Sequence, residues 1–401
     1  MKCVILAAGE GKRMHPLTFT RPKVMLPLVG KPILEWNLMN AKAAGFKKFL
    51  FVVGYKSEMV RDYFKNGKDW SVSIDYVNQG KALGTAHAIS MAEPFVDDCL
   101  VLCGDTIFGV NDIKNVAHKK MGIGLVNVEH AEEYGVVALK GSKVTQIYEK
   151  MEHPTSNTIN AGIYRFKHTI FSYIKKTKKS LRGEYEITDS INQMIVKEPL
   201  EGVFLHHWLD VVYPWHLLDA NEELLKTMKT KLSGTVEKYV MIHGPVTIGK
   251  QTVIRSGTYI EGPVNIGENC RIGPNCYIRP FTSIGNNCHI GNACEIKNSI
   301  IMDHSNVPHQ NYVGDSIIGE QCNLGAGTKI ANLRLDKNVV STVLNGKTLN
   351  TGRKKFGAIL GDNIQTGINT SINTGTIIGN NCFLGPGALV KGTIRPDSTI
   401  L

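Results

Sequence analysis

The pattern of hydrophobic and polar residues divides the chain into two parts. In the first half, short apolar runs at 2–6, 49–53 and 100–103 alternate with helix-like segments such as 33–44. This alternation predicts an α/β fold with a Rossmann-like, mostly parallel sheet that helices cover. Ligands in such sheets usually bind at the carboxyl ends of the strands. Leucines at helical spacing within 214–232 predict an amphipathic helix that closes this domain.

The second part of the chain repeats with a period of six residues. Isoleucine recurs at every sixth position from Ile242 to Ile296, and glycine often follows it. Neither a helix nor a simple alternating strand has this period, whereas each side of a triangular parallel β-helix takes one hexad. A long interruption precedes Leu360, and such a loop inside a regular repeat is often functional. The pattern predicts two domains, 1–232 and 233–401.

The charge balance narrows the kind of partner. Lysine and arginine number 46 against 35 aspartate and glutamate residues, a formal net charge of +11, which favours anionic partners. The basic runs at 175–179 and 353–355 are short and hold no aromatic residues, unlike surfaces that bind single-stranded nucleic acid. We therefore expect phosphorylated metabolites as partners and no nucleic acid.

Export and membrane signals are not expected. No apolar stretch reaches the roughly 18 residues of a membrane-spanning helix. The first apolar run ends at Gly9, which is too early for the core of a signal peptide. Nine cysteines in a chain without an export signal are typical of reduced thiols. We expect a cytoplasmic protein without membrane association.

Six of the nine cysteines lie in the hexad repeat, and two interpretations compete for them. Cys270, Cys276, Cys288 and Cys294 each follow a ladder isoleucine by four residues, at a position that threonine takes in other hexads. Zinc sites usually combine closely spaced cysteine pairs with histidine. The single fixed position instead predicts small side chains that pack inside the coil.

The strongest chemical motif follows the first predicted strand. Ala8, Gly9 and Gly11 precede Arg13, and Pro22-Lys23 follows a few residues later. Glycines at such a turn let backbone N–H groups approach a triphosphate closely. Arg13 and Lys23 can then neutralise charge that shifts between phosphates during transfer. The motif is not a Walker A loop, because Gly-Lys-Ser/Thr is missing.

Further short motifs follow in a fixed order along the first domain. They are Gln79 with Gly84-Thr85-Ala86-His87, Gly104-Asp105, Tyr134-Gly135-Val136, Glu149-Lys150, Asn160-Ala161-Gly162, Glu184-Tyr185-Glu186 and Trp208-Leu209-Asp210. In this order and spacing the motifs resemble those of the sugar-1-phosphate nucleotidylyltransferases. The resemblance covers nearly the whole chain. It implies that a sugar-1-phosphate oxygen attacks the α-phosphorus of a nucleoside triphosphate and that pyrophosphate leaves.

The resemblance also assigns ligand-binding residues. It implies Mg²⁺ held by Asp105 and Asp210, a nucleotide bound by Ala8, Gly9, Gly11, Gln79, Gly84 and Thr85, and a sugar phosphate bound by Gly135, Glu149, Lys150, Asn160 and Glu184. The Gly-Thr-Ala-His form is closer to the uridylyltransferases, whereas Trp-Leu-Asp is like the glucose-1-phosphate thymidylyltransferases. The choice between UTP and dTTP, and the sugar, stay open.

A second candidate site lies where the hexad register slips. His309 and Tyr312 resemble the His-x-x-Tyr of the bifunctional N-acetylglucosamine-1-phosphate uridylyltransferase/glucosamine-1-phosphate acetyltransferases. A neutral histidine can deprotonate an amine that attacks acetyl-CoA. The resemblance implies a left-handed β-helix that forms a homotrimer. It further implies Asn332 as a catalytic residue, Asn323 and Lys337 as sugar-phosphate ligands, and Gly367, Ile368 and Pro386 as an acetyl-CoA groove.

The sequence therefore predicts a bifunctional enzyme. It would transfer acetyl from acetyl-CoA to glucosamine-1-phosphate and uridylyl from UTP to N-acetylglucosamine-1-phosphate. One alternative is a glucose-1-phosphate thymidylyl- or uridylyltransferase whose β-helix serves assembly only. The other is a non-catalytic module that senses nucleotide sugars and offers the β-helix as a partner surface.

Overall fold

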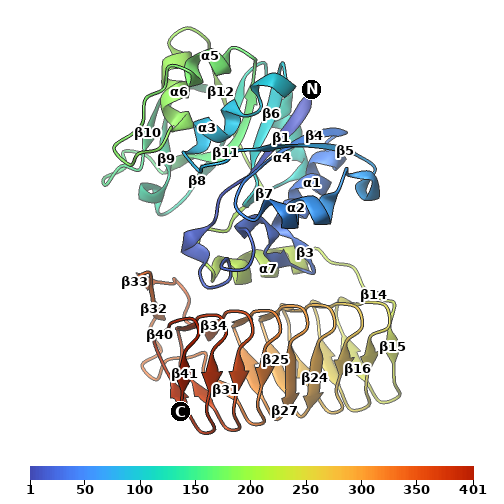
Figure 1. Cartoon of the computed structure of the whole chain (residues 1–401). Helices are drawn as coiled ribbons and strands as arrows, with labels where there is room; N and C mark the ends of the chain where they lie inside the picture. The colour runs from blue at the N-terminus through green and yellow to red at the C-terminus, as the bar shows by residue number, and fades with distance from the viewer. The chain divides into compact units, whose positions relative to one another are not determined.

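The computed structural model describes residues 1–401, which pack into two compact units (Figure 1). The first unit comprises Met1–Glu10, Pro22–Met25 and Pro32–Asp210; the second comprises Gly11–Arg21, Leu26–Lys31 and Val211–Leu401. The expected amphipathic helix is present as α7 (His216–Lys226), but it packs with the second unit. By packing, the second unit therefore extends beyond the predicted domain 233–401 and includes two segments from near the N-terminus.

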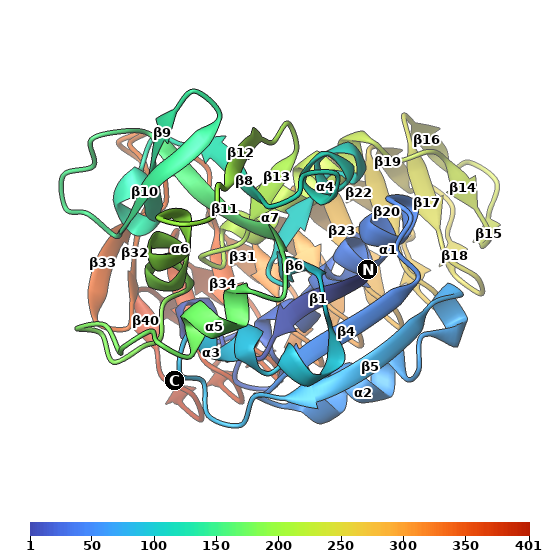
Figure 2. The same cartoon turned by 90° about the horizontal axis from the view of Figure 1, so that it is seen from above.

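A nine-stranded sheet forms the centre of the first unit, in the order β5-β4-β1-β6-β11-β8-β12-β10-β9 (Figure 2). Its strands are β1 (Lys2–Ala7), β4 (Lys48–Val53), β5 (Ser73–Asn78), β6 (Cys99–Cys103), β8 (Gly122–Asn127), β9 (Gly135–Lys140), β10 (Lys143–Glu149), β11 (Thr158–Phe166) and β12 (Glu201–Phe204). The strands from β5 to β6 are parallel, as predicted. Strands β10 and β11 run antiparallel to their neighbours, so the other half of the sheet is mixed.

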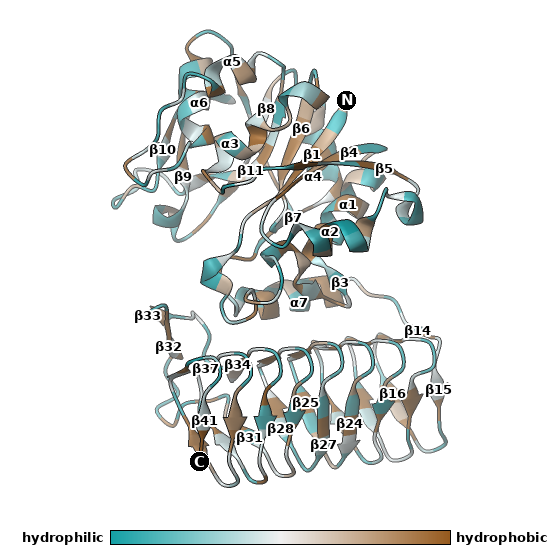
Figure 3. Cartoon of the chain, viewed as in Figure 1, coloured by the Kyte–Doolittle hydropathy of each residue, from teal (hydrophilic) through white to brown (hydrophobic).

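Helices cover both faces of the parallel strands. They are α1 (Ile33–Ala43), α2 (Ser57–Phe64), α3 (Thr85–Ser90), α4 (Val110–Ala117), α5 (Ile170–Ile174) and α6 (Ile187–Ile195). Cys3 and Ile5 pack in one buried cluster with residues of α1, α2 and α4, whereas Val4 packs in another with residues of α3, α5 and α6. Successive side chains of a strand point to opposite faces, so a strand covered on both sides is apolar along its length, as Figure 3 shows for β6 and for β1 after Lys2.

Short elements complete the first unit and its connections. They are β7 (Thr106–Phe108), which pairs with β13 (Trp208–Asp210), β2 (Pro27–Leu28), β3 (Lys31–Pro32), and the 3₁₀ helices η1 (Lys12–Met14), η2 (Lys23–Met25), η3 (Lys68–Trp70), η4 (Glu93–Phe95) and η5 (Ala131–Glu133).

None of the helices combines the length and the apolar character that crossing a membrane requires.

The hexad repeat forms three parallel sheets, one on each side of the coil, and the strands of each sheet stack from coil to coil (Figure 1). The first contains β14 (Lys231–Leu232), β17 (Val246–Ile248), β20 (Val264–Ile266), β23 (Thr282–Ile284), β26 (Ile300–Ile301), β29 (Ile317–Ile318), β34 (Ala358–Leu360), β37 (Thr376–Ile378) and β40 (Thr393–Ile394). The second contains β15 (Thr235–Val236), β18 (Val253–Ile254), β21 (Arg271–Ile272), β24 (His289–Asn292), β27 (Asn306–His309), β30 (Asn323–Leu324), β35 (Gln365–Thr366), β38 (Phe383–Leu384) and β41 (Thr399–Ile400). The third contains β16 (Met241–His243), β19 (Tyr259–Glu261), β22 (Tyr277–Ile278), β25 (Glu295–Lys297), β28 (Tyr312–Gly314), β31 (Lys329–Ile330), β36 (Ser371–Ile372) and β39 (Leu389–Val390).

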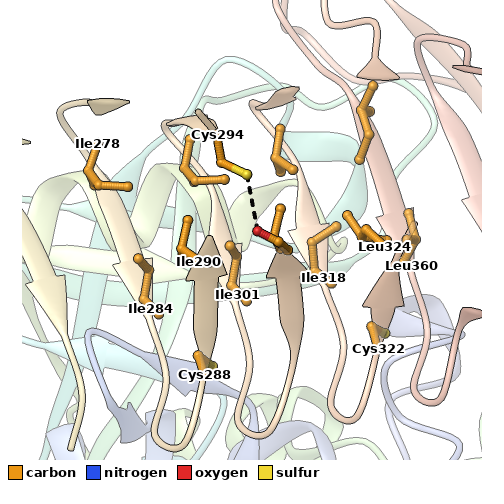
Figure 4. Packing of buried hydrophobic residues seen from close by; sticks show 14 of the residues in the cluster. Ile278, Ile284, Cys288, Ile290, Cys294, Ile301, Ile318, Cys322, Leu324 and Leu360 are labelled. Atoms are coloured by element: carbon orange, nitrogen blue, oxygen red, sulfur yellow. Dashed lines mark hydrogen bonds between the residues drawn. The ribbon is translucent and has the colours of Figure 1, made fainter. Parts of the chain in front are cut away.

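The predicted isoleucine ladder is the core of these coils. Ile248 pairs with Ile266, and Ile266 with Ile284, each one coil of 18 residues further along. The inward side chains from all three sheets form one continuous buried cluster (Figure 4). Three hexads therefore make one turn of a parallel β-helix.

The structure explains why the register slips after Ile296. Ile284 pairs with Ile301, only 17 residues away, so one side of this coil is a residue shorter. Val313 rather than Tyr312 occupies the inward position, and Tyr312 faces outward. The long interruption is an arm, residues 331–357, whose hairpin pairs β32 (Ser341–Leu344) with β33 (Lys347–Asn350).

The cysteines of the repeat are packed inside the coils. Cys270, Cys276, Cys288, Cys294, Cys322 and Cys382 are all buried, and Cys294 Sγ donates to the Val307 carbonyl at 3.1 Å (Figure 4). No three His, Cys, Asp or Glu side chains gather anywhere in residues 1–401 to form a metal site. The packing interpretation of these thiols is therefore confirmed.

We expect the repeat thiols to resist modification in the folded protein. All six thiols are buried, and burial raises the pKa of the Cys276 and Cys322 thiols to about 12, so almost no reactive thiolate is present at those two positions near neutral pH. A chromogenic disulfide reagent should release its coloured product slowly from the native protein and rapidly after addition of guanidinium chloride. Fast reaction of all six thiols in the native protein would contradict this packing.

Candidate functional site

The predicted phosphate-binding motif begins at the carboxyl end of β1. Ala8 is buried, and its carbonyl accepts the N–H of Tyr55 at 3.1 Å. Gly9 is exposed, and a Cβ placed on it would meet no atom within 4 Å. The N–H of Gly104, just after β6, donates to the Leu6 carbonyl at 2.9 Å. The ends of β1 and β6 therefore lie side by side, with open space beside Gly9 for a ligand.

Two carboxylates lie at this edge of the sheet. Lys23 Nζ donates to Asp105 Oδ2 at 2.6 Å, and the pairing of β13 with β7 sets Asp210 opposite Thr106. Thr106 Oγ1 and Tyr134 Oη each donate to Asp210 at 3.0 Å. Burial raises the pKa of Asp210, Lys23 opposes this effect, and the charge of Asp105 adds to it. These oxygen donors fit Mg²⁺, which usually takes one or two carboxylates together with substrate phosphates.

The predicted base-recognition residues are also close together. Gln79 is buried, and its Nε2 donates to the Gly84 carbonyl at 3.3 Å. Gly84 has φ +107°, and a Cβ there would lie 2.6 Å from the Tyr185 carbonyl oxygen and 3.1 Å from Glu184 Cβ. Thr85 then begins α3. Only glycine allows the two segments to approach so closely, so Gln79, Gly84 and Glu184 lie close together.

The predicted sugar-binding segments pair along the β9–β10 hairpin. Gly135 lies opposite Glu149 in the register of the two strands. Thr188 Oγ1 and Arg182 Nη2 each donate to the Glu149 carboxylate at 3.1 Å. Burial raises the pKa of Glu149, and a neighbouring carboxylate adds to the effect. These contacts hold Glu149 in one orientation.

Tyr134 connects this hairpin with the carboxylate pair. Its carbonyl accepts the N–H of Lys150 at 3.0 Å, and its hydroxyl donates to Asp210. Asn160 Nδ2 donates to Tyr164 Oη at 2.6 Å, and Asn160 Oδ1 accepts the N–H of Gly162 at 3.0 Å. Hydrogen bonds therefore orient the side chains of Glu149 and Asn160, and Tyr134 connects the backbone of Lys150 with the candidate metal ligand Asp210.

The phosphate-binding motif itself is divided between the two units. Gly9 packs in the first unit, whereas Gly11 and Arg13 pack in the second. Gly11 has φ +75° and directly precedes η1, and Thr18 Oγ1 donates to its carbonyl at 2.9 Å. The exposed Arg13 guanidinium lies 5.6 Å from the ring centre of Tyr213. Gly11 and Arg13 thus pack with residues that follow Asp210 in the sequence.

In the β-helix, the candidate acetyl-transfer residues surround one corner. Asn298, Asp315 and Asn332 occupy this corner in three successive coils, and Asp315 is almost completely buried. Asn298 Nδ2 donates to Asp315 Oδ1 at 2.9 Å, and Asn332 Nδ2 donates to Asp315 Oδ2 at 2.5 Å. Lys297 Nζ donates to the same carboxylate at 2.9 Å. Asp315 therefore holds Asn332 and a cation at one place.

His309 and Tyr312 stand on either side of the preceding corner. The exposed His309 ends β27 of the second sheet, and Tyr312 begins β28 of the third. A Cβ on Gly314 would lie 2.6 Å from Tyr312 Oη and 2.7 Å from Asn332 Nδ2. Burial raises the pKa of Tyr312, and the charges of Glu295 and Asp315 add to the effect. The Tyr312 hydroxyl and the Asn332 amide thus both lie close to the backbone of Gly314, where a side chain would not fit.

The other residues predicted for acetyl transfer are more dispersed. Asn323 lies in β30, on the second sheet, and Lys337 lies in an exposed turn of the arm. Gly367 and Pro386 stack on neighbouring coils, because a Cβ on Gly367 would lie 2.5 Å from the Pro386 nitrogen. Ile368 is 56% exposed beside them.

Sequence reasoning missed several residues that orient the predicted ones. Thr106, Arg182 and Thr188 donate to Asp210 or Glu149, and Lys297 donates to Asp315. Lys297 could have been predicted from the sequence, because it directly precedes Asn298 at the corner position that recurs in each coil. The other three depend on strand pairing and helix packing, which short motifs do not encode.

Comparison with known proteins defines the class. The nucleotidyl transferase family model matches residues 2–227, the model of the GMPPB C-terminal domain matches 260–380, and a hexapeptide repeat of succinyl-transferase matches 375–394. The chain therefore belongs to the nucleotidyl transferase family. A putative glucose-1-phosphate thymidylyltransferase from Bacillus anthracis, solved with a sucrose, is 31% identical with a TM-score of 0.52, over 58% of this chain and 97% of that chain.

Relatives that match over the whole length of the chain define the class of protein more narrowly. A Bifunctional protein GlmU from Methanocaldococcus jannaschii is 41% identical, over 100% of this chain and 97% of that protein. A bifunctional sugar-1-phosphate nucleotidylyltransferase/acetyltransferase from Sulfurisphaera tokodaii is 40% identical, over 98% and 97% respectively. The resemblance inferred from the motifs is confirmed.

We expect Gly314→Ala to impair the β-helix site alone. The added methyl group would displace the Tyr312 hydroxyl and the Asn332 amide, since both lie within 3 Å of its position. Acetyl transfer should fall about tenfold or more, because misplaced catalytic groups lose rate steeply. Pyrophosphate release by the same preparation provides the internal control and should stay within twofold. Unchanged acetyl transfer would show that this corner is not part of the site.

Proposed function

We propose that the protein catalyses two consecutive reactions of UDP-N-acetylglucosamine synthesis. One transfers acetyl from acetyl-CoA to glucosamine-1-phosphate. The other transfers uridylyl from UTP to N-acetylglucosamine-1-phosphate and releases pyrophosphate. The observation that carries this proposal is the presence of two separate polar clusters in one chain. One surrounds Asp105 and Asp210, the other surrounds Asp315.

For nucleotidyl transfer, the sugar phosphate attacks the α-phosphorus in line, without a covalent enzyme intermediate. Asp105 and Asp210 would hold Mg²⁺, which when bound neutralises charge on the phosphoryl oxygens. Lys23 is only 8% exposed and is oriented by Asp105, so its ammonium can stabilise phosphate charge in a poorly hydrated place. Arg13 supplies a second cation.

For recognition, the carboxamide of Gln79 binds the base and the backbone of Gly9 approaches the phosphates. Glu149 and Asn160 bind sugar hydroxyls, because each is oriented by hydrogen bonds that leave it little freedom. A second candidate substrate pair is glucose-1-phosphate with dTTP, favoured by Trp208-Leu209-Asp210 and by the similarity to the solved thymidylyltransferase.

For acetyl transfer, His309 accepts the proton of the attacking amine. Tyr312 and Asn332 orient the amino sugar, and Lys297 faces its phosphate. We propose that the β-helix is left-handed and assembles as a homotrimer, with acetyl-CoA in the groove at Gly367, Ile368 and Pro386. The exposure of Ile368 supports a ligand or a partner at this place.

The decisive experiment assays the purified full-length protein against a panel of sugar-1-phosphates and nucleoside triphosphates. Pyrophosphate and free CoA thiol are measured separately, with and without acetyl-CoA. We expect His309→Ala to lower acetyl transfer by about 10²–10⁴-fold and to leave pyrophosphate release unchanged. His304→Ala, an exposed histidine of the same coil, is the matched control. Full acetyl transfer by His309→Ala would refute the assigned base, and none by the wild type would favour an inert β-helix.

Metal removal should separate the two activities. Chelation with EDTA, or Asp210→Asn, should lower pyrophosphate release by at least about a hundredfold, because a bound cation supplies several kcal/mol of charge stabilisation. Acetyl transfer should be unaffected, and added Mg²⁺ should restore only the chelated wild type. Asp75→Asn, which removes an exposed carboxylate paired with Lys2, is the control. Undiminished turnover of the Asp210→Asn variant would contradict the proposed ligand.

A further inference from the structure

One segment of the phosphate-binding motif is packed against the β-helix. We call Gly11–Arg21 the phosphate-loop segment. It follows Glu10 and precedes Pro22, both in the first unit, yet it belongs to the second. It carries Arg13, the cation proposed to stabilise phosphate charge. What holds this segment therefore determines where Arg13 stands.

Arg21 anchors the end of the phosphate-loop segment. Its side chain is 5% exposed, and its Nη2 lies 2.5 Å from Asp362 Oδ2 while its Nη1 donates to Glu320. Thr20 Oγ1 also donates to Asp362. Burial alone would lower the pKa of Arg21, but the charges of Asp362 and Glu320 together outweigh it and raise the pKa. The Arg21 guanidinium is thus permanently charged and binds two carboxylates at once through its two terminal nitrogens.

The two carboxylates are themselves rigidly placed. Glu320 follows β29 and Asp362 follows β34, and these strands are neighbours in the first sheet. The N–H of Glu320 donates to Asp362 Oδ1 at 2.8 Å. The arm, residues 331–357, leaves and re-enters the β-helix between these two turns. Arg21 therefore binds to the two coils between which the arm is inserted.

The arm provides a second, independent anchor. Asn345 at the tip of its hairpin donates from Nδ2 to the Lys12 carbonyl at 3.2 Å. Phe356, where the arm ends, lies edge-on to Trp215, with ring centres 6.2 Å apart. Trp215 stacks on Tyr213 at 4.8 Å, and Tyr213 faces the Arg13 guanidinium. A continuous row of contacts thus runs from the β-helix to Arg13.

The geometry points to Arg21 as a positioning residue for nucleotidyl transfer. Arg21 binds the β-helix and, through the phosphate-loop segment, fixes the position of Arg13. A buried ion pair contributes little net stability but defines geometry well. Catalytic groups misplaced by about 1 Å can lose a hundredfold in rate. This inference rests on the role proposed for Arg13.

The test compares both activities in full-length variants, assayed at one temperature well below their unfolding midpoints. Arg21→Gln should lower kcat for pyrophosphate release about tenfold to a hundredfold while acetyl transfer stays within twofold. Arg21→Lys keeps the charge but loses the fork, and should recover part of the loss. Arg165→Gln, which removes a similarly buried arginine paired with Asp98, is the matched control and should change neither activity.

A second variant keeps the inference falsifiable if Arg21→Gln does not fold. Tyr213→Leu removes the stacking contact with Arg13 and leaves the ion pairs of Arg21 intact. It should also lower pyrophosphate release and spare acetyl transfer. Equal loss of both activities in Arg21→Gln, with no effect of Tyr213→Leu, would overturn the inference in favour of a purely structural role.

Arg13→Gln distinguishes failure of the inference from failure of the proposed function. If Arg13→Gln impairs pyrophosphate release but Arg21→Gln and Tyr213→Leu do not, the positioning role is overturned and the role of Arg13 stands. If Arg13→Gln retains full turnover, the role proposed for Arg13 is overturned, and the inference with it.

Discussion

In the β-helix, each inward side chain stacks on the one a coil away, and this stacking determines where every outward residue points. Ile248, Ile266 and Ile284 form one such column, and the backbone hydrogen bonds of their strands run between the same coils. A one-residue shift within a strand would turn its side chains to the opposite face. Changes in length are therefore tolerated only at the corners. Both the shortened coils and the arm occur there.

The candidate acetyl-transfer site is a consequence of these corner changes. The side between Val313 and Ile318 is one residue shorter than a hexad, and Asp315 within it adopts φ +50°. Its carboxylate is turned toward the coil stack, where the side chains one coil before and one coil after donate to it. A buried carboxylate is stable only when it is hydrogen-bonded and paired. Lys297, Asn298 and Asn332 meet that requirement, and so become fixed themselves.

Periodicity and motif order predicted much of this architecture. The ladder, the buried cysteines and the parallel strands of the first sheet each depend on local patterns that the sequence displays directly. The mixed half of that sheet was not predicted, because antiparallel partners such as β11 and β8 are chosen by tertiary packing. The orientation of Asp210 by Thr106 depends on strand pairing across 104 residues. The membership of Gly11–Arg21 in the second unit depends on ion pairs across 299 and 341 residues, which no local pattern reveals.

The arm shows why a regular repeat needs an irregular insertion in order to do chemistry. The sides of a β-helix are flat, and equivalent positions recur from coil to coil, so a constellation of side chains that occurs only once needs a departure from the repeat. The arm begins at Asn332, whose side chain binds Asp315, and ends at Phe356, whose ring meets Trp215. Between them, Asn345 reaches the carbonyl of Lys12. Since Phe356 N–H also donates to the Asn332 carbonyl at 2.9 Å, the two ends of the arm are closed on each other.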